Sequence, residues 1–226
     1  FPTKQRVCPS AEEIDALADL LNKAEKVTIF CGIGAKDAHK ELVELSRRLN
    51  APVAYSFKSK MEIQYDNPNE VGMTGLLGMP SGYYSMHEAE VLLLLGTDFP
   101  YEAFMPQNNT IVQVDIKANR LGRRAKIKMG LCGDVKDTLQ ELLPLVRQKT
   151  NDSFLREQLA HYDKVKRNLR SAAEVKGKDE KIQPEYVISM IDELASKDAV
   201  FTVDTGMTCV WGARYLQATG KRKMLG

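Results

Sequence analysis

The sequence predicts an α/β fold in which a parallel sheet is flanked by helices, followed by the beginning of a second α/β domain. Residues 91–95 form an uninterrupted apolar run that ends at Gly96, as expected of a strand buried on both faces. Similar short runs at residues 27–30 and 111–115 are separated by segments with helical spacing of apolar residues. Because strands that alternate with helices form parallel sheets, the fold is interpreted as Rossmann-like.

The expected elements alternate along the first 150 residues. Ser10 and Glu13 form a capping-box pattern ahead of an apolar helical stripe. A second helical stripe follows the first strand, and a third follows Asp134, which can cap a helix. The expected strands are residues 27–30, 52–55, 91–95, 111–115 and 127–131.

Residues 61–90 are predicted to be a long connection, with a helix that begins at residues 83–87. Loops longer than ~12–15 residues in a compact domain are usually functional or partly structured. The glycines of this connection are Gly72, Gly75, Gly78 and Gly82. Because glycine lets the backbone approach a ligand closely, this loop is one candidate wall of a site.

The chain changes character after residue 150. Residues 151–183 combine a helical stripe with dense charge, which predicts a helix and a linker between domains. Pro184 suits the first turn of a new helix, and residues 199–203 are expected to be a buried strand. Residues 184–226 therefore begin a second α/β domain. We expect the sequence to be a fragment, because it starts at Phe1 and stops as another strand begins.

Composition excludes several classes of function. The formal net charge of +2 comes from 32 basic and 30 acidic residues, which gives no general argument for nucleic acid or a membrane surface. The basic segment at residues 117–128 has no interleaved aromatic residues, so it is interpreted as a solvated face, with no nucleic-acid partner. The four cysteines show no close pairing, which favours a reducing compartment. The three histidines lack metal-ligand spacing, and no apolar run approaches the ~18 residues of a membrane span.

The ends of the strands supply the candidate binding residues. Ligands of open parallel sheets bind beyond the carboxyl ends of the strands, which is where Gly96 lies. Asp115 at another strand end suits a ribose hydroxyl, although a turn aspartate has the same pattern. A plain tight turn explains the Gly-x-Gly of residues 32–34 about as well as a phosphate site. Lys58 and Lys60 could meet a phosphate, but the default interpretation is surface lysine.

Longer stretches resemble one enzyme family. The likeness is carried by GMTGLLG and, after a buried strand, by GTDFPYEAF, and the flanking stretches are YDNPNEVGMTG and IVQVDIKANRLG. These segments are similar to the middle domain of thiamine-diphosphate-dependent pyruvate oxidases, above all the quinone-linked pyruvate dehydrogenase branch. Near the end, FTVDTGMTCVWGARYL resembles the start of that family's diphosphate-binding domain. The resemblance spans almost the whole chain.

The resemblance implies an FAD-binding middle domain of the DHS type at residues 1–150, a charged helical linker at residues 151–183, and the truncated start of a thiamine-diphosphate domain at residues 184–226. FAD is the cofactor implied for this piece. The residues that match the family's cofactor-binding positions are Gly34, Thr74, Gly75, Leu76, Leu77, Gly96, Thr97, Asp98, Phe99, Pro100, Asp115 and Asp134. Asp98 replaces a more usual glutamine, which adds negative charge, removes an amide donor and leaves contact through the backbone.

The parent enzyme implied by the resemblance oxidatively decarboxylates pyruvate on thiamine diphosphate and passes electrons through FAD to quinone or oxygen. The family's catalytic glutamate and its Mg²⁺ motif lie outside this sequence. We therefore expect no catalytic or metal-ligating residue here, and no activity of the piece alone. Family members are homotetramers. Membrane attachment depends on a further C-terminal segment, so the protein is expected in the cytoplasm or peripheral to the inner membrane.

Two alternatives stay open. One is an acetohydroxyacid synthase-like enzyme, in which FAD is mainly structural, although GTDFPYEAF favours the oxidase. The other is a non-catalytic module that binds NAD or another nucleotide, because fold alone does not determine function.

Overall fold

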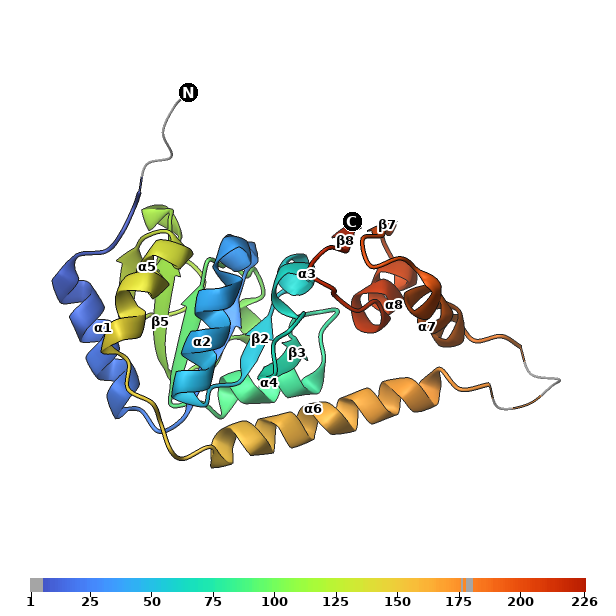
Figure 1. The fold of residues 1–226 in the computed structure, drawn as a ribbon, viewed down its shortest axis with the longest axis horizontal. Coiled ribbons are helices and arrows are strands. Elements are labelled where there is room, and N and C mark those ends of the chain that lie inside the picture. The colour runs from blue at the N-terminus through green and yellow to red at the C-terminus, as the bar shows by residue number, and fades with distance from the viewer. Residues whose placement is uncertain (1–5, 176, 178–180) are drawn as a thin grey trace, which may run out of the picture.

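The computed structural model describes residues 6–175, 177 and 181–226. Its centre is a six-stranded sheet with the order β3-β2-β1-β4-β5-β6 (Figure 1), in which every neighbouring pair is parallel. The strands are β1 (Val27–Cys31), β2 (Val53–Tyr55), β3 (Glu70–Met73), β4 (Val91–Leu95), β5 (Thr110–Asp115) and β6 (Met129–Cys132). A separate parallel pair is formed by β7 (Val200–Thr202) and β8 (Lys223–Leu225). The predicted α/β fold is confirmed.

Helices flank the large sheet and continue beyond it. The α-helices are α1 (Ala11–Lys23), α2 (His39–Leu49), α3 (Lys60–Ile63), α4 (Pro80–His87), α5 (Val135–Leu142), α6 (Ser153–Ala172), α7 (Pro184–Leu194) and α8 (Met207–Tyr215). Short 3-10 helices are found at Ile33–Ala38, Phe57–Ser59, Glu102–Phe104, Ala118–Arg120 and Leu143–Leu145.

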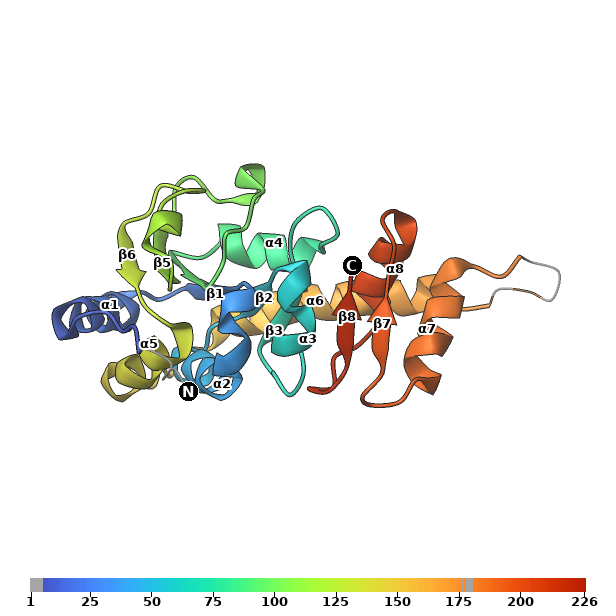
Figure 2. The same ribbon diagram turned by 90° about the horizontal axis from the view of Figure 1, so that it is seen from above.

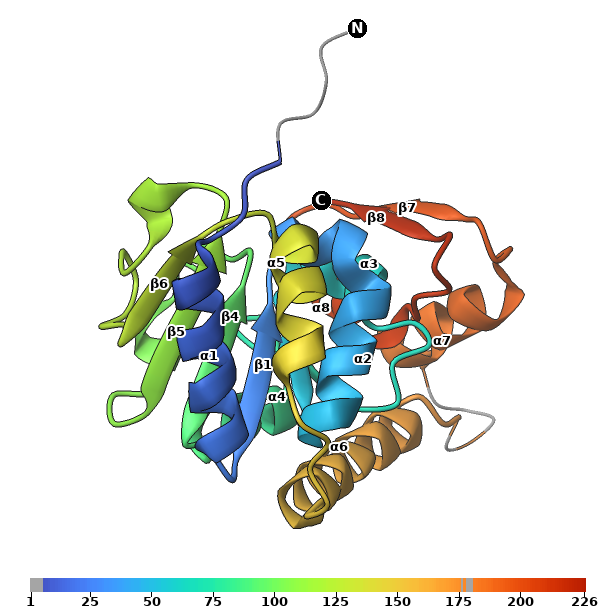
Figure 3. The same ribbon diagram turned by 60° about the vertical axis from the view of Figure 1, so that its left-hand side comes forward.

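Both faces of the sheet are covered, as the uniformly apolar strands predicted. Successive strand residues point to opposite faces, so Ile29 joins the core under α1, α2 and α5, whereas Phe30 joins the core under α4 and α6. All five residues of β4 are buried. Figure 3 shows α1, α2 and α5 together on one face of the sheet.

Local signals set two of the helix starts. Ser10 completes a capping box, because its Oγ accepts from Glu13 N at 3.3 Å and its own N–H donates to the Glu13 carboxylate at 2.8 Å. Asp134 caps α5 by accepting from the backbone N–H groups of Lys136 and Asp137. Both caps were predicted from the sequence.

The prediction of one long connection over residues 61–90 was wrong. The segment contains most of α3, the edge strand β3 and helix α4, so the glycine-rich loop is limited to residues 74–79. The edge strand was missed because it is short and contains Gly72 at φ +88° instead of an apolar run. Helix α4 begins at Pro80, earlier than predicted, because proline suits the first turn of a helix.

Helix α6 packs on the core of the first unit. Tyr162 is buried, and its hydroxyl donates to the Glu70 carboxylate of β3 at 2.9 Å. Gln158, also buried, donates to Glu88 at 2.6 Å. Figure 1 shows α6 running alongside α4 below the sheet. This helix therefore completes the second core cluster.

The elements α7, β7, α8 and β8 form a small unit next to α3 (Figure 2). The prediction that its first strand is buried was wrong: Val200 and Thr202 are exposed, because β8 is the one strand that pairs with β7 among the described residues. Arg214 of α8 donates to the carbonyl oxygens of Leu77 and Gly78, both at 3.3 Å. The unit therefore holds one side of the glycine-rich loop.

Candidate functional site

The carboxyl ends of β1 and β4 lie side by side in the middle of the sheet, where the strand order changes direction. Open parallel sheets bind ligands in the crevice at such a point. The N–H of Gly34 donates to Gly96 O at 3.0 Å, and the N–H of Gly32 donates to Leu95 O at 2.9 Å. A Cβ added to Gly96 would lie 2.6 Å from Gly34 Cα. The two backbones touch because glycine occupies both positions, and no side chain blocks the crevice.

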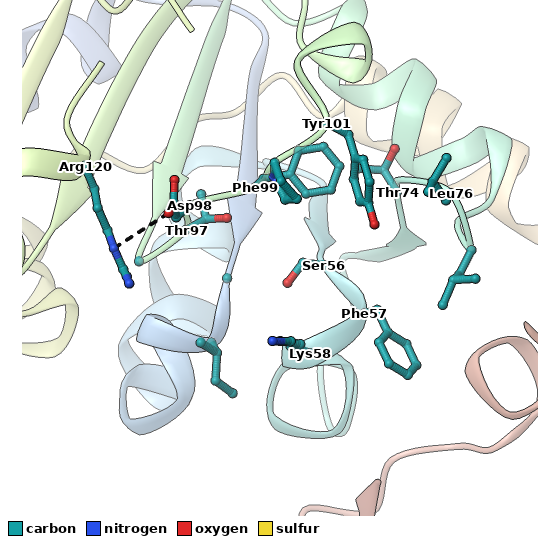
Figure 4. A pocket seen from close by; sticks show the side chains of 15 residues that line it. Ser56, Phe57, Lys58, Thr74, Leu76, Thr97, Asp98, Phe99, Tyr101 and Arg120 are labelled. Carbon is teal, nitrogen blue, oxygen red and sulfur yellow. Dashed lines mark ion pairs between the residues drawn. The ribbon is translucent and has the colours of Figure 1, made fainter. Parts of the chain in front are cut away.

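Two cavities open at this crevice. The first, of about 400 Å³, contains eight predicted residues: Thr74, Leu76, Leu77, Gly96, Thr97, Asp98, Phe99 and Pro100. The second, of about 210 Å³, contains Gly34, Gly96, Asp115 and Asp134. Figure 4 shows the first cavity between the loop after β3 and the end of β4. Residues predicted at the ends of five separate strands are therefore brought together.

The structure places the predicted glycines Gly34 and Gly75 differently. Gly75 does not line either cavity. At φ +108°, a Cβ added to it would lie 3.1 Å from the Phe99 ring, so glycine lets the loop pack closely against that ring. Gly34 lines the second cavity, but its N–H is already used by Gly96. The turn leads into the 3-10 helix Ile33–Ala38 and not directly into α2.

Each cavity contains one buried polar atom without a hydrogen bond among the described residues. Thr74, 4% exposed, lines the first cavity with its Oγ1 unpartnered, and Asp115, 1% exposed, lines the second with its Oδ2 unpartnered. The other carboxylate oxygen of Asp115 accepts from Lys117 N at 2.9 Å. Buried polar atoms in folded proteins are normally hydrogen-bonded. These two atoms therefore mark positions where a polar ligand group fits.

Cations line both cavities; Lys58 was considered as a phosphate contact from the sequence, whereas Lys36 and Arg120 were missed. Lys58 lines the first cavity, Lys36 the second, and Arg120 both. Arg120 belongs to the basic segment interpreted as a solvated face. Its position five residues after Asp115, in the turn that follows the strand, was the signal available. Asp98 is also more than a backbone contact, because its side chain lies within 4.0 Å of three arginines of that segment.

Lys60 does not lie on the surface, contrary to the default interpretation. It is 1% exposed and lies near enough to Glu70 for the two charges to interact; the Glu70 carboxylate also accepts hydrogen bonds from Tyr55 and Tyr162. Burial lowers the pKa of Lys60 to about 8, while the negative charge of Glu70 opposes that shift. Burial also raises the pKa of Glu70 above its ordinary value. Lys60 is therefore a structural charge beside the site.

A family model for the central domain of thiamine pyrophosphate enzymes matches residues 14–142, more than half of the chain. This chain belongs to that family. The matched residues hold all six strands of the large sheet and both cavities' strand ends. The family resemblance inferred from the sequence is confirmed at this level, and membership supports thiamine diphosphate as the cofactor of the family's enzymes.

Individual relatives include proteins with different names. An uncharacterized 42.6 kDa protein encoded in the isoamylase 3' region of Pseudomonas amyloderamosa is 47% identical over 72% of this chain and 41% of its own length. Pyruvate oxidase of Lactiplantibacillus plantarum is 27% identical over 93% of this chain and 35% of its own. Acetolactate synthase 1 of Zea mays is 26% identical over 96% and 35%. The chain thus spans about two fifths or less of the length of each of these relatives.

The described part of the chain contains no group of three or more His, Cys, Asp or Glu side chains placed to hold a metal ion. None of the helices resolved there has the length and apolarity that crossing a membrane requires.

Proposed function

We propose that this central domain binds FAD, with the flavin end in the first cavity and the adenosine end in the second. The observation that carries the proposal is the pair of adjacent cavities at the strand switch, each with a buried polar atom that lacks a hydrogen-bond partner. A dinucleotide is an elongated ligand with two dissimilar ends, which suits two connected cavities of different size.

The two cavities differ in the chemistry that they offer. Side chains of Phe57, Leu76 and Phe99 give the first cavity apolar surface for an aromatic ring, while the Thr74 hydroxyl can bond to a ring or ribityl polar atom. The Asp115 carboxylate in the second cavity can accept hydrogen bonds from ribose hydroxyls. Residues 96–100 line the first cavity and Gly96 also lines the second, so their backbone groups are available to the ligand there.

The parent activity that we propose is oxidative decarboxylation of pyruvate, with quinone or oxygen as the electron acceptor and a homotetramer as the assembly. Bound FAD would accept two electrons during turnover, while thiamine diphosphate and Mg²⁺ would be held by other parts of the enzyme. The described residues position and enclose the flavin nucleotide, and none is assigned a proton-transfer role. The chain alone is therefore expected to bind flavin without turning over pyruvate.

Acetolactate synthase activity is the second candidate. The relatives of that name are about as similar to this chain as the pyruvate oxidase is, at 26% and 27% identity. In that case the nucleotide would occupy the same crevice, and flavin reduction by pyruvate in the complete enzyme would separate the two activities.

Equilibrium dialysis of the purified chain against FAD and NAD tests the proposal. We expect one FAD per chain, visible as flavin absorbance at about 450 nm, and no comparable retention of NAD. The variant Thr74→Val keeps the shape of the side chain but removes the hydroxyl. It is expected to weaken FAD about fivefold to tenfold, the usual effect of one hydrogen bond. Retention of NAD without FAD would replace the proposal with the nucleotide-module alternative.

A further inference from the structure

Arg120 occupies the boundary between the two cavities. Three residues line both cavities: Ile33, Gly96 and Arg120. Of these, Arg120 alone carries a charge. Any ligand that extends from one cavity into the other must therefore pass this guanidinium. Figure 4 shows Arg120 at one side of the first cavity, joined by a dashed line to Asp98.

The Arg120 side chain is attracted by two carboxylates without being bonded to either. Its Nε lies 3.9 Å from Asp98 Oδ2, and its Nη1 lies 4.0 Å from Asp115 Oδ2. Both separations exceed hydrogen-bond length, and its guanidinium donates no hydrogen bond within the described part of the chain. A guanidinium has five N–H donors, so its bonding capacity remains available at the cavity boundary.

The backbone beneath this side chain is fixed. The N–H of Arg120 donates to Lys117 O at 3.0 Å, and its carbonyl accepts from Gln113 Nε2 at 3.2 Å. Gln113 is itself buried in β5 and also donates to Thr97 O at 3.1 Å. The 3-10 helix Ala118–Arg120 is thus tied to the ends of both β4 and β5, next to the crevice.

The negative charge of Asp98 is already compensated. Arg123 Nη1 donates to Asp98 Oδ2 at 3.3 Å, and Arg124 Nε donates to Asp98 Oδ1 at 3.2 Å. The charged side chains that line the two cavities are Lys36, Lys58 and Arg120 on one side of the balance and Asp98, Asp115 and Asp134 on the other. Because Arg123 and Arg124, which line neither cavity, already bond to Asp98, the donors of Arg120 remain available to an anionic ligand group at the boundary.

We propose that Arg120 binds the diphosphate of the dinucleotide, and that Asp98 is a positioning residue that holds residues 120–124 against the cavity rim. This inference rests on the proposed flavin site and adds a specific anion contact to it. The forked donors of a guanidinium match phosphate oxygens in pairs, so the contact depends on the shape of the group as well as its charge. Ligands without a phosphate gain nothing from Arg120.

The test compares FAD with riboflavin, which has no phosphate, in binding to the full chain and to the variants Arg120→Ala, Arg120→Lys and Arg123→Ala. Arg120→Ala is expected to weaken FAD about tenfold to hundredfold and to leave riboflavin unchanged. The FAD affinity of Arg120→Lys should lie between those of the natural chain and Arg120→Ala, because lysine keeps the charge but lacks the paired donors of the guanidinium. Arg123→Ala is the matched control, since Arg123 contacts Asp98 but lines neither cavity, and a change of less than about threefold is expected.

Asp98→Asn tests the positioning role through a double-mutant cycle. Alone, it is expected to weaken FAD about threefold to tenfold without affecting riboflavin; combined with Arg120→Ala, it should weaken FAD no further. The salt dependence of FAD affinity should also be shallower in Arg120→Ala than in the natural chain.

The outcomes separate this inference from the flavin proposal. If Arg120→Ala binds FAD as tightly as the natural chain does, or loses riboflavin equally, the diphosphate contact is wrong while the flavin site stands. If the natural chain binds neither flavin, both are wrong. Circular dichroism melting of each variant checks folding; Arg120→Gln provides a second neutral variant of similar size if Arg120→Ala unfolds.

Discussion

Replacing Gly96 with alanine is expected to lower the free energy of unfolding by about 2 to 5 kcal/mol and to close the crevice. Gly96 has φ +57°, a conformation that costs an L residue about 1–2 kcal/mol. The added Cβ would also lie 2.6 Å from the backbone of Gly34, and overpacking of this kind costs a further ~1–3 kcal/mol. Neither backbone can move without disturbing the ends of β1 and β4. Urea denaturation measures the loss.

Gly122→Ala is the matched control. Gly122 also has a positive φ, +71°, but the nearest atom to an added Cβ is 3.5 Å away, at Ile127 Cγ1. This variant should therefore show the conformational cost of about 1–2 kcal/mol alone. The difference between the two variants measures the contact between the strand ends. Equal losses of stability in the two variants would mean that the close approach of Gly96 to Gly34 adds nothing to the cost of an alanine at residue 96.

The central part of the fold could be predicted because its signals are local. The apolar run of β4, the capping box at Ser10 and the cap at Asp134 each depend on neighbours within a few residues. The same holds for Gly96, whose position at the end of a buried strand indicated a site. Strand β3 was missed because it lies at the sheet edge and contains a glycine in place of an apolar residue.

The electrostatics of the site could not be predicted because their partners are distant in sequence. Asp98 pairs with arginines 25 and 26 residues later, and only the turn after β5 brings them together. The charge pattern of residues 117–128 is the same for a solvated face as for one that partly lines a cavity. Lys60 gave no sign of burial for the same reason, since its acidic neighbour Glu70 belongs to a strand that was not predicted.

The buried cluster around Glu70 leads to the second prediction of large effect. Glu70 accepts hydrogen bonds from Tyr55 at 2.6 Å and Tyr162 at 2.9 Å, and its charge favours the buried ammonium of Lys60. The variant Glu70→Leu would leave two hydroxyls without an acceptor and weaken the compensation of Lys60. Loss of one partner from a buried charge cluster typically costs several kcal/mol. We therefore expect the free energy of unfolding, measured by urea denaturation at pH 7, to fall by about 3 kcal/mol.

Glu62→Leu is the control for the loss of a carboxylate at the surface. Glu62 forms an ion pair with Lys223 at 2.5 Å, but Lys223 is half exposed, and such pairs contribute at most about 1 kcal/mol. Tyr162→Phe removes a single hydroxyl from the cluster and should cost about 1 kcal/mol. A loss in Glu70→Leu no larger than that in Glu62→Leu would show that the cluster does not act as a unit.

The pH dependence of stability distinguishes charge effects from packing. Because burial lowers the pKa of Lys60 from 10.5 to about 8, the unfolded chain binds more protons between these values, and stability should rise with pH across that window. The raised pKa of Glu70 acts in the opposite sense: its contribution is complete below pH 4.5 and is lost as the pH rises through the folded value. Without Glu70, the pKa of Lys60 should fall further, so the rise in Glu70→Leu should begin below pH 8. An unchanged profile between pH 7 and 10 would contradict the coupling of Glu70 to Lys60.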